Sequence, residues 1–175
     1  MDSEAARELL ALGATLQRAA DDIGVGRPQK TSPSAGNEPR SEIEQFDDLV
    51  TSTALRSASR QLFVDGHYAH AVEEAIKCLN NAVKAKSGRS DLDGDRLMRQ
   101  AFSVDNATLA LNGRQSQSEK DEQRGYMDLF AGAWTGIRNP RAHEHHLQDD
   151  PDVALEMIVL ANHLMRKLDA STKVK

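Results

Sequence analysis

An arginine and a histidine near the C-terminal end of this chain, Arg138 and His143, have side chains that could carry out chemistry on a phosphate. They bound the string Arg-Asn-Pro-Arg-Ala-His, with four residues between them. An imidazole gives or takes a proton near neutral pH, and a guanidinium presents a planar fork of donors that matches phosphate oxygens. Because no metal is needed for this chemistry, the pair is our candidate catalytic site for cleavage of RNA.

The backbone around the motif decides whether the two side chains meet. On an unbroken α-helix, positions five apart are turned by roughly 140° from each other, so Arg138 and His143 would not share a face. Pro140 lacks an amide proton and restricts the residue before it, so we expect it to push Asn139 out of the helical conformation and to kink the chain. Asn139 would then position the motif or donate to a phosphate, and Arg141 would add local positive charge.

Other polar residues near the motif are candidates for supporting or RNA-binding roles. His143, Glu144, His145 and His146 are adjacent, so they lack the i,i+4 spacing that places two metal ligands on one face of a helix. We therefore expect opportunistic metal binding there at most, and neither a metal nor another cofactor in the function. Glu144 is assigned a supporting or RNA-binding role. His67, at a predicted helix start, is assigned the same role at the border of the site, although its position favours packing or hydrogen bonding over catalysis.

A purely structural interpretation of these residues is also open. Arg138 could cap the carbonyl end of its helix, and His143 could be a solvated turn residue. Trp134 lies on an apolar stripe, which favours a place in the core or in a dimer interface over base stacking. Glu73 and Glu74 are interpreted as a solvated helix face.

Composition limits the classes of function. The chain has 175 residues, 39% of them hydrophobic, with 22 basic and 27 acidic residues and a net charge of −5. This charge counts against a protein that coats nucleic acid non-specifically, and RNA binding must rely on local basic patches. The single Cys78 excludes an internal disulfide and indicates a reducing compartment. No apolar run approaches the ~18 residues needed to span a bilayer, so we expect a cytoplasmic protein without a membrane partner.

Periodicity and turn residues predict an all-α chain. We expect an N-terminal amphipathic helix at residues 1–23, a flexible linker at 24–42 and a helical domain at 43–171. Strand-type alternation is absent, so the predicted architecture is an antiparallel four- to five-helix bundle.

Five helices are predicted from the apolar spacing and the capping residues of this domain. One continuous helix is expected from Ser41 to the Asp65-Gly66 turn, with a stripe of Phe46, Val50, Ala54, Ala58 and Leu62. The remaining predictions are a helix from His67 to Lys86 that Gly88 ends, a short helix from Gly94 to Phe102, a helix opened by a Ser116/Glu119 capping box, and a last helix opened by Pro151.

Several strings in this order resemble a bacterial family of the HEPN superfamily that is known as Ymh-like. The similarity covers roughly residues 45 to 170 and is carried by Phe63-x-Asp65-Gly66-His67-Tyr68-x-x-Ala71-Val72-Glu73-Glu74-Ala75, Leu97-Met98-x-x-Ala101-Phe102-Ser103, Leu129-Phe130-Ala131-Gly132 and Arg138-Asn139-Pro140-Arg141-Ala142-His143-Glu144. The resemblance implies a helical bundle. It also implies a metal-independent ribonuclease, since active members carry an Arg-x(4 to 6)-His motif and occur in toxin-antitoxin, abortive-infection and CRISPR-linked systems.

The resemblance further implies a homodimer whose composite active site contains two copies of the motif, with RNA as the substrate and an antitoxin or other regulatory protein as a partner. In toxins paired with nucleotidyltransferase antitoxins the histidine is often followed two residues later by a tyrosine that the partner modifies. His145 stands at that position here, so we do not expect that modification.

Two other classes of function remain open from the sequence. The chain could be a noncatalytic helical module that binds RNA or a protein, or a structural oligomer whose N-terminal helix binds the partner.

Overall fold

The computed structural model describes residues 40–144 and 147–174 of the chain. The predicted helix at residues 1–23 and the linker up to residue 39 lie outside the described residues. The described residues belong to one helical unit that begins at Arg40.

Two helices stand where one was predicted at the start of this unit: α2 (Glu42–Leu49) and α3 (Thr53–Val64). The helix breaks because Ser52 caps α3, its hydroxyl accepting from the amide of Leu55. The amide of Ser52 in turn donates to the side chain of Asn162 over 2.9 Å, which ties the break to the C-terminal helix. After the break the predicted stripe is displaced by one residue, and the buried positions of α3 are Leu55, Ser59 and Phe63.

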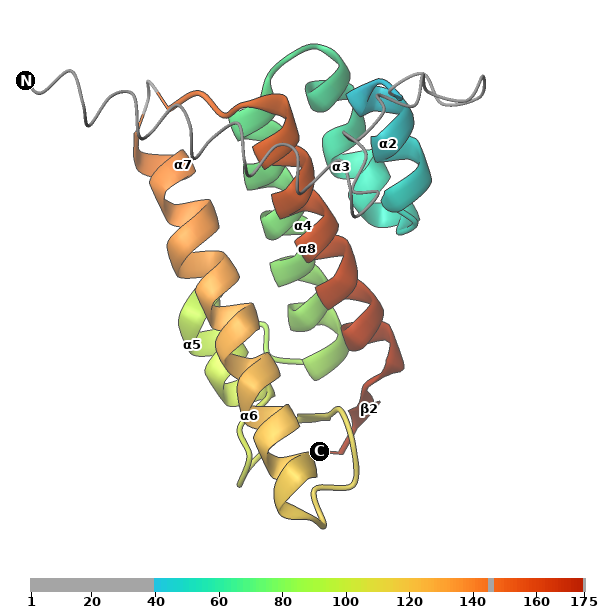
Figure 1. The fold of residues 1–175 in the computed structure, drawn as a ribbon. Coiled ribbons are helices and arrows are strands. Elements are labelled where there is room, and N and C mark those ends of the chain that lie inside the picture. The colour runs from blue at the N-terminus through green and yellow to red at the C-terminus, as the bar shows by residue number, and fades with distance from the viewer. Residues whose placement is uncertain (1–39, 145–146, 175) are drawn as a thin grey trace, which may run out of the picture. The chain divides into compact units, whose positions relative to one another are not determined.

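The long helix α4 (Tyr68–Ser87) is the centre of the unit, and the last helix α8 (Pro151–Ala170) lies beside it (Figure 1). Both helices were predicted, as was the end of α4 at Gly88, which has φ 77°. The expected antiparallel arrangement is wrong for this pair. Lys86, near the end of α4, donates to the carbonyls of Leu168 and Asp169 at the end of α8, so the two helices run parallel.

The short helix α5 (Gly94–Ala101) packs against α6 (Gln117–Gly132), and both helices were predicted. Ser116 and Glu119 form the predicted capping box. α6 is antiparallel to α8, because Glu122 pairs with Lys167 at 2.9 Å and Tyr126 with His163 at 2.8 Å.

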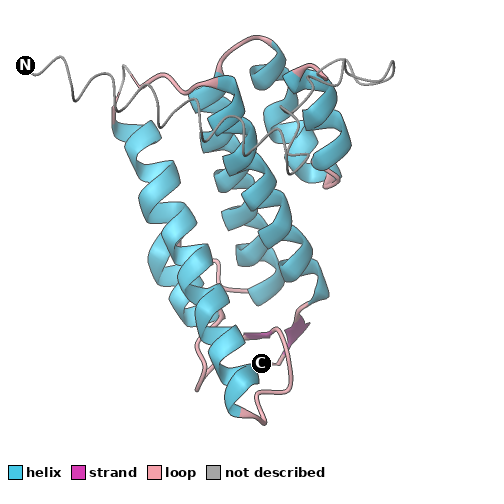
Figure 2. Cartoon of the chain, in the orientation of Figure 1, coloured by secondary structure: helices cyan, strands magenta, loops and turns pink. Residues whose placement is uncertain are grey.

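Two very short strands, β1 (Leu109–Ala110) and β2 (Thr172–Lys173), pair antiparallel near the C-terminus (Figure 2). They were not predicted from the sequence, because strands of two residues are too short to show alternation. The rest of the described chain is helical apart from loops. No helix in residues 40–144 or 147–174 is long and apolar enough to cross a membrane.

One hydrophobic core connects these helices. Phe102 and Phe130 stack at 4.4 Å between ring centroids where α5 meets α6. Of the five apolar residues that the helical period predicts for the inner face of α4, Val72, Ile76, Leu79 and Val83 are fully buried and Ala69 is partly buried. The core therefore fixes α4 and α6 as the two elements that bring the motif into place.

Candidate functional site

The motif begins in a π-helical turn, η1 (Ala133–Arg138), that continues α6, and it ends in α7 (Asn139–His143). Asn139 keeps helical angles of φ −62° and ψ −43°, so the expected break before Pro140 is wrong. Its amide donates to the carbonyl of Trp134, five residues back, in place of the usual four. The wider turn gives the proline ring room against the preceding turn, which an α-helical register would deny it.

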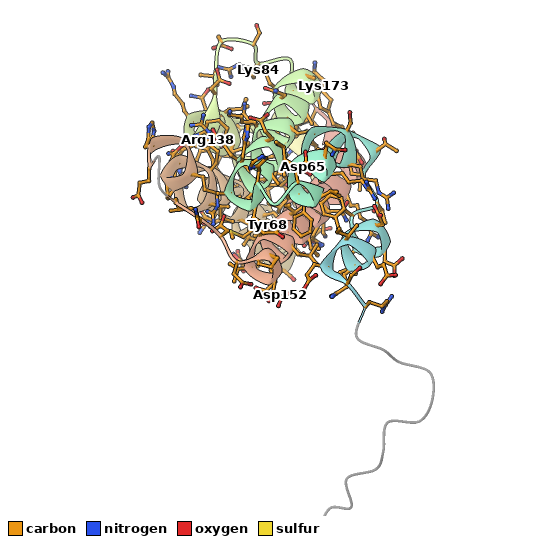
Figure 3. All side chains as sticks on the ribbon, turned by 90° about the horizontal axis from the view of Figure 1, so that it is seen from above. Asp65, Tyr68, Lys84, Arg138, Asp152 and Lys173 are labelled. Carbon is orange, nitrogen blue, oxygen red and sulfur yellow. The ribbon has the colours of Figure 1, made fainter. Side chains whose placement is uncertain are left out.

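Arg138 is held in place by three neighbours. Its guanidinium carbon lies 4.6 Å from the centroid of the Trp134 ring, and one amino group is 3.6 Å from a carboxylate oxygen of Glu73 on α4. The other amino group donates to the side chain of Asn139 at 3.4 Å, which is a weak hydrogen bond. Figure 3 looks down on the unit and labels Arg138 together with Tyr68 of α4. The arginine thus faces α4 with one edge still accessible.

Trp134, which supports Arg138, depends on a glycine across the contact between α5 and η1. A Cβ atom added to Gly94 would collide with the indole ring of Trp134. Gly94 also has φ 58°, a conformation that residues with a side chain rarely adopt. The glycine therefore lets the indole, and with it the guanidinium, sit close to the start of α5.

Glu73 is not the solvated residue that we expected. Its side chain is only 14% exposed and lies between two cations, the ammonium group of Lys77 at 2.9 Å and the guanidinium of Arg138. Lys77 also pairs with Glu74 at 2.8 Å. Hydrogen bonds that Lys77 donates to Glu74 and Glu73 raise the pKa of Lys77, so its ammonium group stays charged at neutral pH. Glu73 therefore joins Lys77 of α4 to Arg138 of the motif in one charged network.

Arg141 is anchored inside the protein. Its guanidinium makes two hydrogen bonds of 2.6 Å with Asp149, and both side chains are 9% exposed. A third hydrogen bond of 2.7 Å reaches the carbonyl of Ile137. Asp149 neutralises the positive charge that we expected Arg141 to offer to RNA. The ion pair instead holds α7 against the segment before α8.

A cleft of about 830 Å³ lies between the start of α4 and α7. Three of our candidate residues, His67, Arg141 and Glu144, line it together with Glu73 and His70. Arg138 and His143 are not among its lining residues. Glu73 is therefore the link between this cleft and the catalytic candidate Arg138.

Comparison with known proteins gives one result. A family described as "Protein of unknown function (Hypoth_ymh)" matches residues 51–168. The chain belongs to the Hypoth_ymh family. No curated protein and no solved structure matches the chain.

The Hypoth_ymh match runs from the start of α3 almost to the end of α8, so it contains the motif, Glu73 and the Arg141–Asp149 pair. Within this region the remaining candidates have ordinary helix-end positions. His67 precedes α4 as its N-cap residue and caps nothing with its ring, while Glu144 is the C-cap of α7. Both are exposed, as is His143. His145 and His146 lie outside the described residues.

Sequence reasoning missed three residues that shape this site, and the reason differs for each. Asp149 belongs to a polar turn in the sequence, and nothing local pairs it with Arg141. Trp134 was expected to be buried or at an interface, but not to support Arg138. For Glu73 a signal existed, because Lys77 stands four positions later on the same helix face.

Proposed function

We propose that this protein is a metal-independent endoribonuclease of the HEPN type, acting in bacterial defence or in toxin-antitoxin growth control. The resemblance of its motif strings, its helical fold and its membership of the Hypoth_ymh family are consistent with this proposal. The single observation that carries it is that Trp134, Glu73 and Asn139 hold Arg138 in place while His143, at the other end of the motif, is exposed.

The contacts of Arg138 support a role beyond helix capping. The side chain is 20% exposed, yet its Nε atom is buried without a hydrogen-bond partner among the described residues. A buried donor left unpaired costs free energy, and such groups in native proteins call for an explanation. We explain the unpaired Nε by the orientation of the two amino groups of Arg138 toward a phosphate. An arginine that only capped a helix in solvent would not need to be held in this way. Trp134 and Glu73 then act as positioning residues.

His143 supports a site that two copies of the chain complete. In one copy Arg138 leans on α4 whereas His143 is exposed, and neither lines the cleft. One histidine also cannot readily act as base and acid on opposite sides of an in-line displacement, whereas two can divide those roles. We therefore place the active site across a two-fold axis of a homodimer.

A helix face suited to such a dimer runs along α6 and η1 toward the motif. It is formed by the exposed residues Gly125, Leu129, Gly132 and Gly136, and Leu129 is 46% exposed. The three glycines have no neighbouring atom within 4 Å of an added Cβ, so nothing in the described chain covers them. A second copy could approach this face closely, which would bring the two motifs near each other.

The proposed reaction needs only these side chains. One His143 takes the proton of the ribose 2′-hydroxyl as its oxygen forms a bond with the adjacent phosphorus. The bond between phosphorus and the 5′ oxygen breaks, and the second His143 gives that oxygen a proton. The two Arg138 guanidinium groups stabilise the negative charge on the phosphorus centre. The products carry a 2′,3′-cyclic phosphate and a 5′-hydroxyl, and DNA is not a substrate because it lacks the nucleophile.

A cleavage assay on total cellular RNA in the presence of EDTA tests the proposal. The wild type is expected to cut and to leave cyclic phosphate ends, while Arg138→Ala and His143→Ala are expected to be inactive although folded. His163→Ala removes another exposed histidine, on α8, and serves as the matched control that keeps activity. Intact RNA with every protein, together with measurable RNA binding, would replace the nuclease by a noncatalytic binding module.

Mixing the two inactive variants tests the composite site. A heterodimer of Arg138→Ala and His143→Ala subunits retains one arginine and one histidine, whereas the proposed reaction uses two of each, so its activity is expected to stay far below that of the wild type. Activity close to that of the wild type would show that one His143 carries out both proton transfers. Leu129→Glu places a charge on the proposed interface, so it is expected to give a folded monomer without activity. A dimer that survives Leu129→Glu unchanged would move the interface elsewhere.

A further inference from the structure

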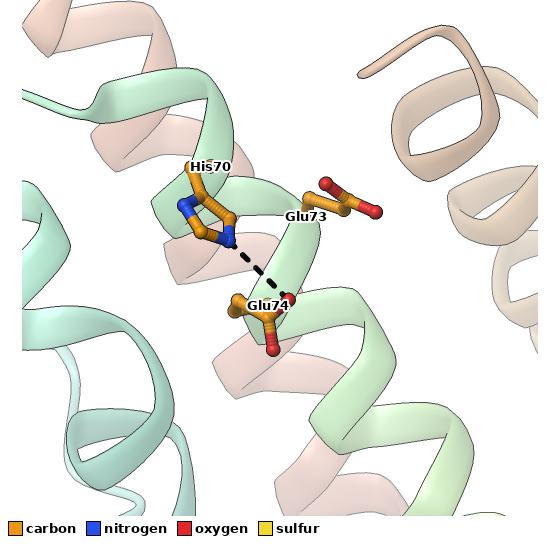
Figure 4. A group of neighbouring side chains, drawn as sticks. All are labelled: His70, Glu73 and Glu74. Carbon is orange, nitrogen blue, oxygen red and sulfur yellow. Dashed lines mark ion pairs between the residues drawn. The ribbon is translucent and has the colours of Figure 1, made fainter. Parts of the chain in front are cut away.

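Three side chains near the start of α4 combine the ligand types that bind transition metals. One potential ligand atom from each of His70, Glu73 and Glu74 lies within 4.8 Å of the other two. His70 Nε2 is already 3.6 Å from a carboxylate oxygen of Glu74 (Figure 4). The three residues stand at positions i, i+3 and i+4, a helical spacing that His143, His145 and His146 lack.

The separations fit a small divalent ion after a modest change of rotamer. Zn²⁺ binds imidazole nitrogen and carboxylate oxygen at about 2.0–2.2 Å in tetrahedral geometry, so its ligand atoms lie roughly 3.4 Å apart. The His70–Glu74 pair meets that separation within a few tenths of an ångström. Glu73 has to move inward by about an ångström, which is the scale of a side-chain adjustment. The cleft beside His70 and Glu73 leaves space for a water molecule as the fourth ligand.

A cation already stands at the two carboxylates. The ammonium group of Lys77 is 2.9 Å from Glu73 and 2.8 Å from Glu74. Both carboxylates are half-buried, and this lysine bridges them. An incoming metal must displace the ammonium group. Because the two cations compete, the affinity of this site for the metal should depend on Lys77.

We propose that His70, Glu73 and Glu74 form a binding site for a divalent transition metal such as Zn²⁺, and that binding draws Glu73 away from Arg138. The carboxylate oxygen that faces Arg138 at 3.6 Å is also the one that binds Lys77. A metal that takes this carboxylate removes the acidic partner of Arg138 and adds positive charge next to it. The guanidinium then loses its fixed orientation, so the metal inhibits the nuclease.

The inhibitory consequence rests on the proposed ribonuclease function, whereas the metal site itself does not. Binding is therefore measured first, without RNA, by calorimetric titration of the full chain with Zn²⁺ at neutral pH. The wild type is expected to show a binding event that His70→Ala weakens by about tenfold or more, since one of its ligands is removed. His163→Ala, which removes an exposed imidazole on α8, is the matched control and should leave that event unchanged.

Lys77→Met separates this site from incidental binding by surface histidines. Removal of the fixed ammonium group is expected to tighten Zn²⁺ binding by about tenfold, because a cation that repels the metal is lost. The affinity of a metal bound by His143, His145 and His146 would not change in Lys77→Met, nor in His70→Ala. Equal affinity of the wild type, His70→Ala and Lys77→Met would overturn the proposal.

The inhibition is tested in the RNA cleavage assay by adding Zn²⁺ over the range in which the site fills. Wild-type cleavage should fall and return with EDTA, whereas His70→Ala should keep cutting at the same Zn²⁺ concentrations. Cleavage by the wild type that persists when the site is full would refute the coupling to Arg138. If no protein cuts RNA at all, the proposed nuclease function fails while the titration still decides the metal site.

Discussion

The ion pair between Arg141 and Asp149 makes the sharpest prediction about what holds the motif in place. Asp149→Asn keeps the shape of the side chain and removes its charge, which leaves the guanidinium of Arg141 buried without its acidic partner. Both side chains are 9% exposed and joined by two hydrogen bonds of 2.6 Å. Breaking a buried pair by removing one partner costs about 3–5 kcal/mol. We expect the low end, about 3 kcal/mol, because the carbonyl of Ile137 still accepts one hydrogen bond from Arg141.

Urea unfolding followed by circular dichroism measures this loss. With a slope of about 1–3 kcal/mol per M of urea, the midpoint of Asp149→Asn should fall by roughly 1 M or more. Asp91→Asn is the matched control, since Asp91 makes the same two-bond contact with Arg89 at 3.0 and 3.1 Å but the side chains are 63% and 35% exposed. Solvent screens that pair, so its loss should hardly move the midpoint.

The expected loss is refuted if Asp149→Asn shifts the midpoint no more than Asp91→Asn does. A double variant, Arg141→Met with Asp149→Leu, provides a second check. Replacing both charges by apolar groups removes the unpaired guanidinium, so the double variant should be more stable than Asp149→Asn alone. A double variant that is less stable than Asp149→Asn would show that the pair acts through geometry and not through charge.

Three further changes test other parts of the fold, each by urea unfolding. Gly88 ends α4 at φ 77°. A side chain in that left-handed conformation costs about 1–2 kcal/mol, so Gly88→Ala should lower the free energy of unfolding by that amount. An unchanged free energy of unfolding would show that the position is not strained. Gln123 is fully buried and pairs with three backbone groups, so Gln123→Leu should cost about 3 kcal/mol or more, and a near-neutral variant would show that water replaces it. Hydrogen bonds from Lys84 and then Asn80 lower the pKa of Asp93. A carboxyl group whose pKa is lower in the folded state stabilises the fold above its ordinary pKa, and this stability is lost as the pH falls through the lowered value. Asp93→Asn should therefore make the free energy of unfolding less dependent on pH below about pH 4. An equally steep acid dependence in both proteins would refute this assignment.

Features set by a few neighbouring residues could be predicted from the sequence. The Ser116/Glu119 capping box, the end of α4 at Gly88 and the start of α8 at Pro151 all appear where they were expected. Each depends on the conformational preference or hydrogen bonding of residues within one helical turn. The same local rules gave the helical periods, and hence the all-α class.

Features that depend on distant partners could not be predicted. The break between α2 and α3 is stabilised by Asn162, more than a hundred residues further along the chain. The parallel pairing of α4 with α8 follows from the long excursion through α5 and α6, which carries the chain back to the starting end of α4. At the motif, Pro140 correctly predicted a departure from the α-helix. The helix accommodates the proline ring by a π turn, however, and does not break.

The charges around the motif bear on how an RNA phosphate would reach it. Of the two arginines in the motif, Arg141 is neutralised by Asp149, so Arg138 is left to bind the phosphate. Arg138 is itself partly balanced by Glu73, which also holds Lys77. A phosphate must therefore compete with a carboxylate whose contact to Arg138, at 3.6 Å, is longer than a strong hydrogen bond. That contact is close enough to orient the guanidinium and weak enough to yield to a doubly hydrogen-bonded phosphate. With a net charge of −5 on the whole chain, such local exchange of partners, and not general attraction, would select where RNA binds.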